Sequence, residues 1–154
     1  MKRDGVLASK TPAAYVEIRV FAHATEDEEK VLAAVRNTLP PQVSENITFK
    51  KSKLTGHYGN PIVLFEAKVK DREHVKAFLE KLAYSLSSLD KEVLAGEIEQ
   101  HVDKGCLYLR LDKQSAYVNE TRLCTTDPIH FRIHFKRVNP KEIAAFCREI
   151  GLIP

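Results

Sequence analysis

The sequence has no tryptophan, one methionine and three cysteines, which lie at positions 106, 124 and 147. The cysteines form no C-x-x-C pair and their number is odd, so we expect neither a zinc knuckle nor a disulfide scaffold. Apolar runs are short, and none approaches the ~18 residues that a membrane-spanning helix needs. These absences predict a cytoplasmic protein in a reducing compartment, without a membrane partner.

A secretory signal is also missing, because residues 1–14 lack the ~7–15-residue apolar core of a signal peptide. We interpret residues 1–14 as a flexible leader and residues 15–154 as a single domain. Charge of one sign is not in large excess, with 24 lysines and arginines against 21 acids and a net charge of +3. This balance excludes a strongly basic arm but allows one basic face that acidic helices offset.

Apolar and polar residues alternate in five segments, which predict strands at 15–22, 47–54, 62–70, 107–111 and 129–136. Helical spacing predicts four helices. The first follows a capping box at Thr25–Glu28, the second follows Asp71, the third spans about 90–101, and the last begins after Asn139. The resulting order, β-α-β-β-α-α-β-β-α, predicts an α+β fold in which helices pack on one face of a mostly antiparallel sheet.

The strand positions that do not face the helices form an open face of this predicted sheet. Seven lysines and arginines fall on that face against two acids, while the helices hold the balancing acids. The nine charged residues are Glu17, Arg19, Lys50, Glu66, Lys68, Lys70, Arg110, Arg132 and Lys136. Such segregation of charge favours a phosphate backbone as the ligand.

Aromatic side chains share the open face and allow two different uses of it. Tyr15, Phe21 and Tyr108 fall on the same side as the cations, where they would be placed to stack on RNA bases. The same three rings would also suit the interface of a homodimeric protein-interaction module that makes no direct RNA contact. A solvated polar face is the remaining interpretation.

A metal-dependent nuclease is another alternative, and it requires carboxylates that converge on one cation. Glu17, Glu66 and Asp112 lie on suitable elements, but no D-x-D or D-x-E pair supports them. His130 and His134 lie four residues apart on a strand, roughly 13 Å, which is too far for two ligands of one metal. We therefore expect no metal site, no cofactor and no catalytic residue.

Two polar turns complete the candidate site. The first follows the strand at 107–111, where we expect Asp112 to cap the turn and to hold Lys113 and Gln114 out at the rim of the sheet. The second joins the predicted strands at 47–54 and 62–70, and it presents His57 and Tyr58 at a loop tip.

Four segments together resemble one family of proteins. They are RVFAHATEDEEKVLAAV at 19–35, LTGHYGNPIVLFEAKVK at 54–70, LYLRLDKQSAY at 107–117 and DPIHFRIHFK at 127–136. In these segments the chain resembles the archaeal RNA-binding proteins labelled predicted exosome subunits. The resemblance implies a ribosomal-protein-like fold, related to the large-subunit protein that binds five-S RNA, with a likeness to double-stranded-RNA-binding domains. It also implies an archaeal cytoplasmic setting, RNA and exosome components as partners, and no catalytic activity.

Residues and resemblance together predict a non-catalytic RNA-binding protein, an accessory of RNA processing or of exosome-mediated degradation. The predicted phosphate contacts are Arg19, Lys50, Arg110, Lys113, Arg132 and Lys136. Tyr58 and Tyr108 are the candidates for stacking, and His57 and Gln114 are the candidates for polar contacts.

Overall fold

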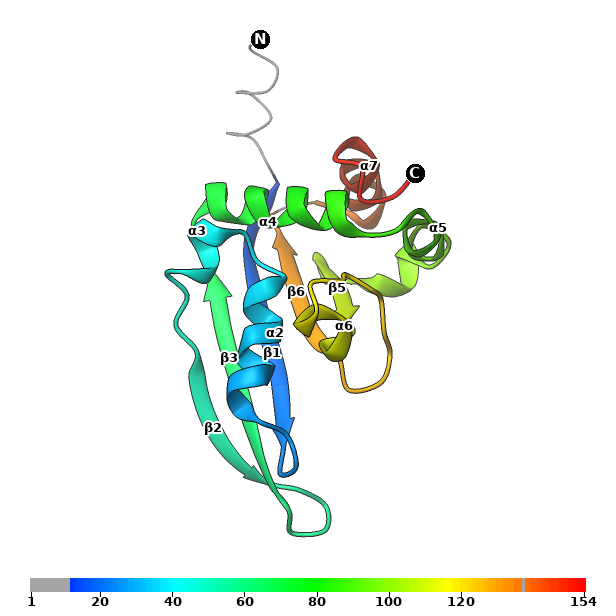
Figure 1. The fold of residues 1–154 in the computed structure, drawn as a ribbon. Coiled ribbons are helices and arrows are strands. Elements are labelled where there is room, and N and C mark those ends of the chain that lie inside the picture. The colour runs from blue at the N-terminus through cyan, green and yellow to red at the C-terminus, as the bar shows by residue number, and fades with distance from the viewer. Residues whose placement is uncertain (1–11, 137) are drawn as a thin grey trace.

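A computed structural model describes residues 12–136 and 138–154, and a single antiparallel sheet runs through it. Its six strands lie in the order β2-β3-β1-β6-β5-β4 (Figure 1). Their bounds are β1 Ala13–His23, β2 Lys50–Thr55, β3 Pro61–Val69, β4 Val102–Asp103, β5 Cys106–Leu111 and β6 Ile129–Phe135. All paired neighbours are antiparallel.

The helices gather on one side of the sheet, and this arrangement confirms the predicted α+β class (Figure 1). They are α2 Glu28–Asn37, α3 Pro41–Ser44, α4 Arg72–Ser85, α5 Ser88–Gly96, α6 Lys113–Tyr117 and α7 Pro140–Glu149, with a short 3-10 helix, η1, at Ile98–His101. In Figure 1, α2, α4 and α6 cross in front of the sheet. The opposite face of the sheet is therefore the open one.

The hydrophobic core lies between the sheet and these helices. In β1, Val16, Ile18 and Val20 are all buried, because every second side chain of a strand points to the same face. Across the layer, the Phe78 ring of α4 stacks on the Phe131 ring of β6, with centroids 5.1 Å apart. The alternation that predicted the strands thus separates a buried face from a charged one.

Helix starts follow the predicted caps at two of three places. Asp71 accepts hydrogen bonds from the first turn of α4, and Asn139 and Glu142 form a complete capping box at α7. The box predicted at Thr25–Glu28 is wrong, because Asp27 is the N-cap of α2 and accepts from the backbone of Glu29. The Glu26 carboxylate instead accepts a hydrogen bond from the backbone N–H of His23, which precedes the helix.

Several other boundaries differ from the sequence prediction. The helix predicted at about 90–101 is divided into α5 and η1, and α6 stands where a turn was expected. The strand β2 begins at Lys50 rather than at position 47. The strand β1 begins at Ala13, so residues 13 and 14 belong to the sheet rather than to the predicted leader. The leader positions 1–11 lie outside the described residues.

A lysine on α4 caps the C-terminal end of α2. The Lys81 ammonium donates hydrogen bonds to the backbone oxygens of Asn37 and Leu39, at 2.7 and 3.0 Å. The last carbonyls of a helix have no partner within it, and a cation there also complements the helix dipole. Burial lowers the pKa of this ammonium. Throughout the described ranges, each helix is too short or too polar to cross a membrane.

Candidate nucleic-acid interface

A groove of about 840 Å³ runs over the open face of the sheet. In the order of the sheet, strands β2, β3, β1, β6 and β5 contribute to its lining. The strand register arranges its side chains in two rows. The first row crosses five strands as Lys50, Glu66, Arg19, His130 and Arg110. Neighbouring strands lie ~4.8 Å apart, so the three cations of this row are spaced at intervals of ~10 Å.

The second row lies two residues further along each strand, on the same face, and crosses four strands. It consists of Lys68, Glu17, Arg132 and Tyr108. Both rows line the groove. The sequence alternation therefore predicted the face correctly, and the strand register adds which residues stand beside one another.

The cations of the two rows differ in what they already contact. Arg132 forms an ion pair with Glu17 at 3.5 Å and lies over the Tyr108 ring, 5.8 Å from its centroid. Arg19, Lys50 and Arg110 are exposed. No salt bridge engages any of these three within the part of the chain that the structure describes. The first row thus presents guanidinium and ammonium groups that can bind an anion without first breaking a contact.

His130 stands between two guanidinium groups in the first row. Burial lowers the pKa of its imidazole, and the charges of Arg19 and Arg110 lower it further, against a smaller opposing effect of Asp127. The ring is therefore neutral at neutral pH. A phosphate placed between the arginines would offset their charge and favour the protonated imidazole.

The aromatic rings of the open face are held by other side chains. Tyr15 stacks on His134, with ring centroids 4.0 Å apart, and the Lys68 ammonium lies 4.1 Å from its ring centroid. His134 in turn contacts Glu17 at 2.7 Å and the Cys106 sulfur at 3.3 Å. These contacts already engage the Tyr15 and His134 rings, which lie outside the lining of the groove, so the exposed cations of the first row are the most available groups of this face.

Lys113 is the predicted site residue that the structure places elsewhere. The expectation that it is held out at the rim is wrong, because its side chain is buried. Its ammonium donates to the Phe21 backbone oxygen at 2.7 Å, to the Glu26 carboxylate at 3.1 Å and to the Asp127 carboxylate at 2.9 Å. With these acceptors around it, the ammonium is not available to an RNA phosphate.

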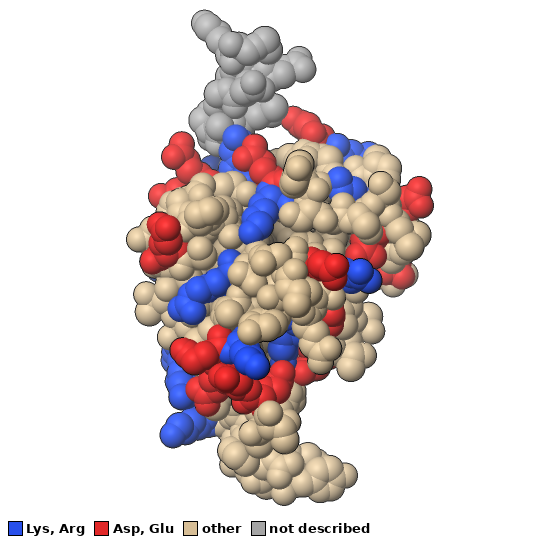
Figure 2. Space-filling model, viewed as in Figure 1, with Lys and Arg blue, Asp and Glu red and all other residues tan. Residues whose placement is uncertain are grey.

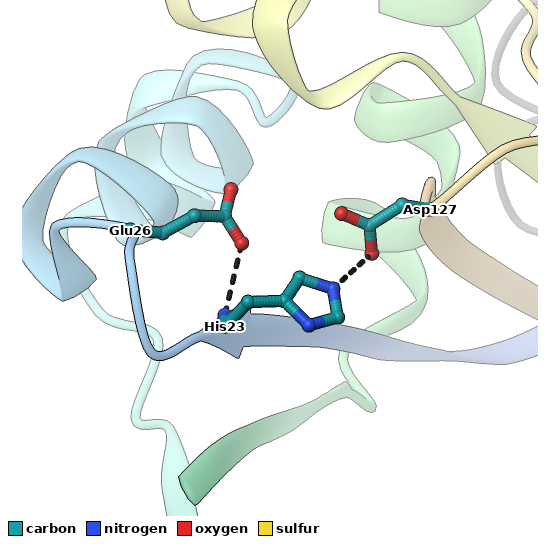
Figure 3. A group of neighbouring side chains, drawn as sticks. All are labelled: His23, Glu26 and Asp127. Atoms are coloured by element: carbon teal, nitrogen blue, oxygen red, sulfur yellow. Dashed lines mark hydrogen bonds and ion pairs between the residues drawn. The ribbon is translucent and has the colours of Figure 1, made fainter. Parts of the chain in front are cut away.

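The carboxylates around Lys113 belong to a cluster with the spacing of metal ligands. His23, Glu26 and Asp127 offer atoms that lie within 4.8 Å of one another (Figure 3). The His23 ring pairs with Asp127 at 3.0 Å. Hydrogen bonds from Lys113 and His23 outweigh the effect of burial and lower the pKa of the Asp127 carboxyl. Lys113 supplies the positive charge that this cluster needs, so the cluster is a structural ion-pair network.

Asp112 has the capping role that the sequence predicts, at the start of a short helix. Its carboxylate accepts from the Ser115 backbone N–H at 3.0 Å and from the Ser115 hydroxyl. The hydroxyl contact is the main reason why the pKa of this carboxyl is lowered. The helix α6 follows, and its first turn turns the Lys113 side chain inward, whereas Gln114 is exposed.

The remaining predicted residues lie around the groove rather than in it. Lys136 is exposed directly after β6. His57 and Tyr58 lie in the β2–β3 loop and line a separate small pocket. Lys68 and His130 are groove residues that the predicted contact set left out, although the alternation had already placed both on the open face. The structure thus brings together Arg19, Lys50, Tyr108, Arg110 and Arg132.

The fold and this face define a class: an α+β protein that presents a row of free cations on an open antiparallel sheet. Comparison with known proteins gives the family. A family described as RNA binding matches residues 15–135. The RNA-binding protein PAB1135 of Pyrococcus abyssi is 38% identical over 141 residues, which are 90% of this chain and 92% of that protein. The chain therefore belongs to this archaeal RNA-binding family.

Solved structures share the fold over nearly the whole chain. Protein AF2318 from Archaeglobus fulgidus, of the family DUF54, has a TM-score of 0.76 and 28% identity, and the match covers 90% of this chain and 99% of that one. Mth689 from Methanothermobacter thermautotrophicus, also a DUF54 protein, has a TM-score of 0.75 and 27% identity, with coverage of 90% and 97%.

Proposed function

We propose that the open sheet face binds the sugar–phosphate backbone of structured RNA. The observation that carries this proposal is the first row, in which three exposed cations without a salt-bridge partner stand at regular intervals across the sheet. Membership of the RNA-binding family supports it. Because the Tyr15 and Tyr108 rings are already in contact with other side chains, the face suits a backbone that is recognised by shape and charge more than bases that stack.

We further propose that the protein is not an enzyme and that it works as an accessory of RNA processing or exosome-mediated degradation. The three carboxylates considered for a nuclease have other settings: Asp112 caps α6, whereas Glu17 and Glu66 stand in different rows among cations. The two carboxylates that do converge, Glu26 and Asp127, already pair with Lys113. The accessory role rests on the resemblance of the four sequence segments to archaeal proteins labelled as exosome subunits. In this role the protein would hold an RNA for a catalytic partner.

Salt-dependent binding by wild type and Arg110→Ala tests the RNA surface. We expect a stem–loop RNA to bind wild type with an affinity that falls as salt rises. Loss of one charged phosphate contact should weaken binding by about 1 kcal/mol, or ~5-fold, and reduce the salt slope by about one unit. The readout is fluorescence anisotropy at several salt concentrations, with circular dichroism as a check that the variant is folded.

The matched control is Arg148→Ala, which removes the same side chain from an exposed position on α7, on the helical side of the protein. It should bind RNA as wild type does, with the same salt slope. Equal losses in both variants, or an affinity that does not change with salt, would contradict a phosphate-binding sheet face.

A further inference from the structure

The β2–β3 loop at residues 56–60 forms a second, smaller hollow that the sheet groove does not include. Together with the turn after β1 it encloses about 270 Å³. Figure 1 places this loop at the lower end of the molecule, beyond the helices. Figure 2 shows the same end as a lobe without charged side chains, which contrasts with the mixed charges above it. This end of the molecule therefore offers a ligand uncharged side chains.

The loop is a defined turn held by its own backbone. The Gly56 N–H donates to the Asn60 oxygen at 2.6 Å, and the Gly59 N–H donates to the Gly56 oxygen at 2.9 Å. Gly59 has φ +80°, which suits glycine, and a Cβ at position 56 would meet the Ile62 side chain at 2.9 Å. These constraints fix the loop before any ligand arrives.

The loop holds a large aromatic ring out in solvent. The Tyr58 residue is 87% exposed, and the His57 ring stands edge-on to it with centroids 4.8 Å apart. An exposed ring that a constrained loop holds in place is available to stack on a ligand. Asn60 also lines the pocket, and its side-chain amide offers both a donor and an acceptor.

We propose that this pocket takes a single unpaired nucleobase of an RNA that lies on the sheet face. The volume, about 270 Å³, is below the ~300–1,000 Å³ of pockets for drug-sized ligands and suits a smaller group. Tyrosine and histidine rings stack on unpaired bases, and an amide reads a base edge. His23 lines the pocket and lies four residues after Arg19 on β1, so the pocket is roughly 13 Å from the first row.

The inference rests on the proposed RNA-binding function and names the RNA class that suits it: a paired stem with an unpaired nucleotide. In such a ligand the stem backbone contacts Arg19 and its neighbours, while the extruded base reaches Tyr58. The pocket would make the protein prefer a stem with an unpaired nucleotide over a fully paired stem, without an additional phosphate contact.

The test compares two blunt-ended RNA duplexes that are identical except that one carries a single-nucleotide bulge, so the other is a fully paired stem. Wild type should bind the bulged RNA more tightly than the fully paired stem. The variant Tyr58→Ala should lose ~5- to 150-fold in affinity for the bulged RNA, the equivalent of the ~1–3 kcal/mol that stacking on one base contributes. Its affinity for the paired stem and its salt slope should not change, because no phosphate contact is lost.

Tyr58→Phe is the matched control, since it keeps the ring and removes only the hydroxyl; it should still prefer the bulged RNA. The pocket proposal is overturned if wild type binds both RNAs equally, or if Tyr58→Ala weakens both to the same extent or neither. Failure of the sheet-face proposal looks different, because then Arg110→Ala would not weaken binding of the fully paired stem.

Discussion

His130 links the charge of the sheet face to pH. It stands between Arg19 and Arg110 with a lowered pKa, which burial and the two guanidinium groups cause. A bound phosphate would raise that pKa again, so binding would be coupled to proton uptake. We therefore expect the RNA affinity of wild type to increase as the pH is lowered from about 7.5 to about 5.5, a range that spans the ordinary histidine pKa of about 6.5.

His130→Gln should flatten this rise in affinity, measured by anisotropy at constant salt. His74→Gln, on α4 of the helical side, should keep it. A profile that is equally steep in His130→Gln would contradict the coupling.

The stability of the free protein should change with pH in the opposite direction to RNA affinity, and fall as the pH is lowered. Because the folded state holds the pKa of His130 below its unfolded value, its contribution to stability is fully present above about pH 6.5 and is lost as pH falls below that value and through the lower pKa of the folded state.

At the scale of single residues, sequence reasoning succeeded where alternation alone decides the position. Arg19, Arg110 and Arg132 fall on the open face because each alternates with buried neighbours. It failed for Lys113, whose acceptors on Glu26 and Asp127 come from distant turns. Nothing in the local pattern of a lysine after a strand indicates partners 87 residues away.

The network around Lys113 ties three elements together. Its hydrogen bonds join α6 to the β1 backbone, to the turn before α2 and to the loop before β6. Lys113→Met would keep the packing of the stem and leave two carboxylates without their cation. We expect the free energy of unfolding to fall by about 3 kcal/mol, the low end for breaking a buried pair, because both partners are partly exposed.

Urea unfolding followed by circular dichroism measures this loss. Lys30→Met, at an exposed position on α2, is the control and should change stability by less than about 0.5 kcal/mol. A loss of similar size in both variants would show that the network contributes little. RNA affinity of folded Lys113→Met should stay close to wild type, since the ammonium does not face the groove.

At the scale of elements, long periodic segments were predictable and short ones were not. Asp71 and Asn139 cap long amphipathic helices, and both were correctly assigned. The helices α3 and α6 have four and five residues, too few to show a helical period. Their positions are set by tertiary contacts, such as the hydrogen bonds from Asn37 to the backbone of α6.

The whole molecule separates its two faces by charge, and this bears on the alternative of a homodimer. The side seen in Figure 2 mixes lysines and arginines with acids. The open face has an excess of cations over its acids Glu17 and Glu66. Two copies that met through their open faces would bring like charges together, which disfavours association. We expect a monomer by sedimentation at micromolar concentration and low salt.

Tyr108→Glu gives the matching test of that expectation, because it places an acid within the groove. The variant should keep the sedimentation of wild type and should bind RNA more weakly. A wild-type dimer that Tyr108→Glu dissociates would contradict the proposed RNA surface and favour the interaction module.

The α+β architecture itself followed from the sequence, whereas the row order did not, because the strand register depends on pairing across the whole sheet.

The two edges of the sheet limit its growth. One edge is β2, whose Lys50, Lys51 and Lys53 are exposed, and the other is β4, which has only two residues. A row of lysines repels an incoming strand, and a two-residue edge offers too few free backbone groups to pair with one. The sheet is thereby protected at both ends from the edge-to-edge addition that leads to fibrils. The lysine of the first row thus has a second use, in keeping the protein dispersed.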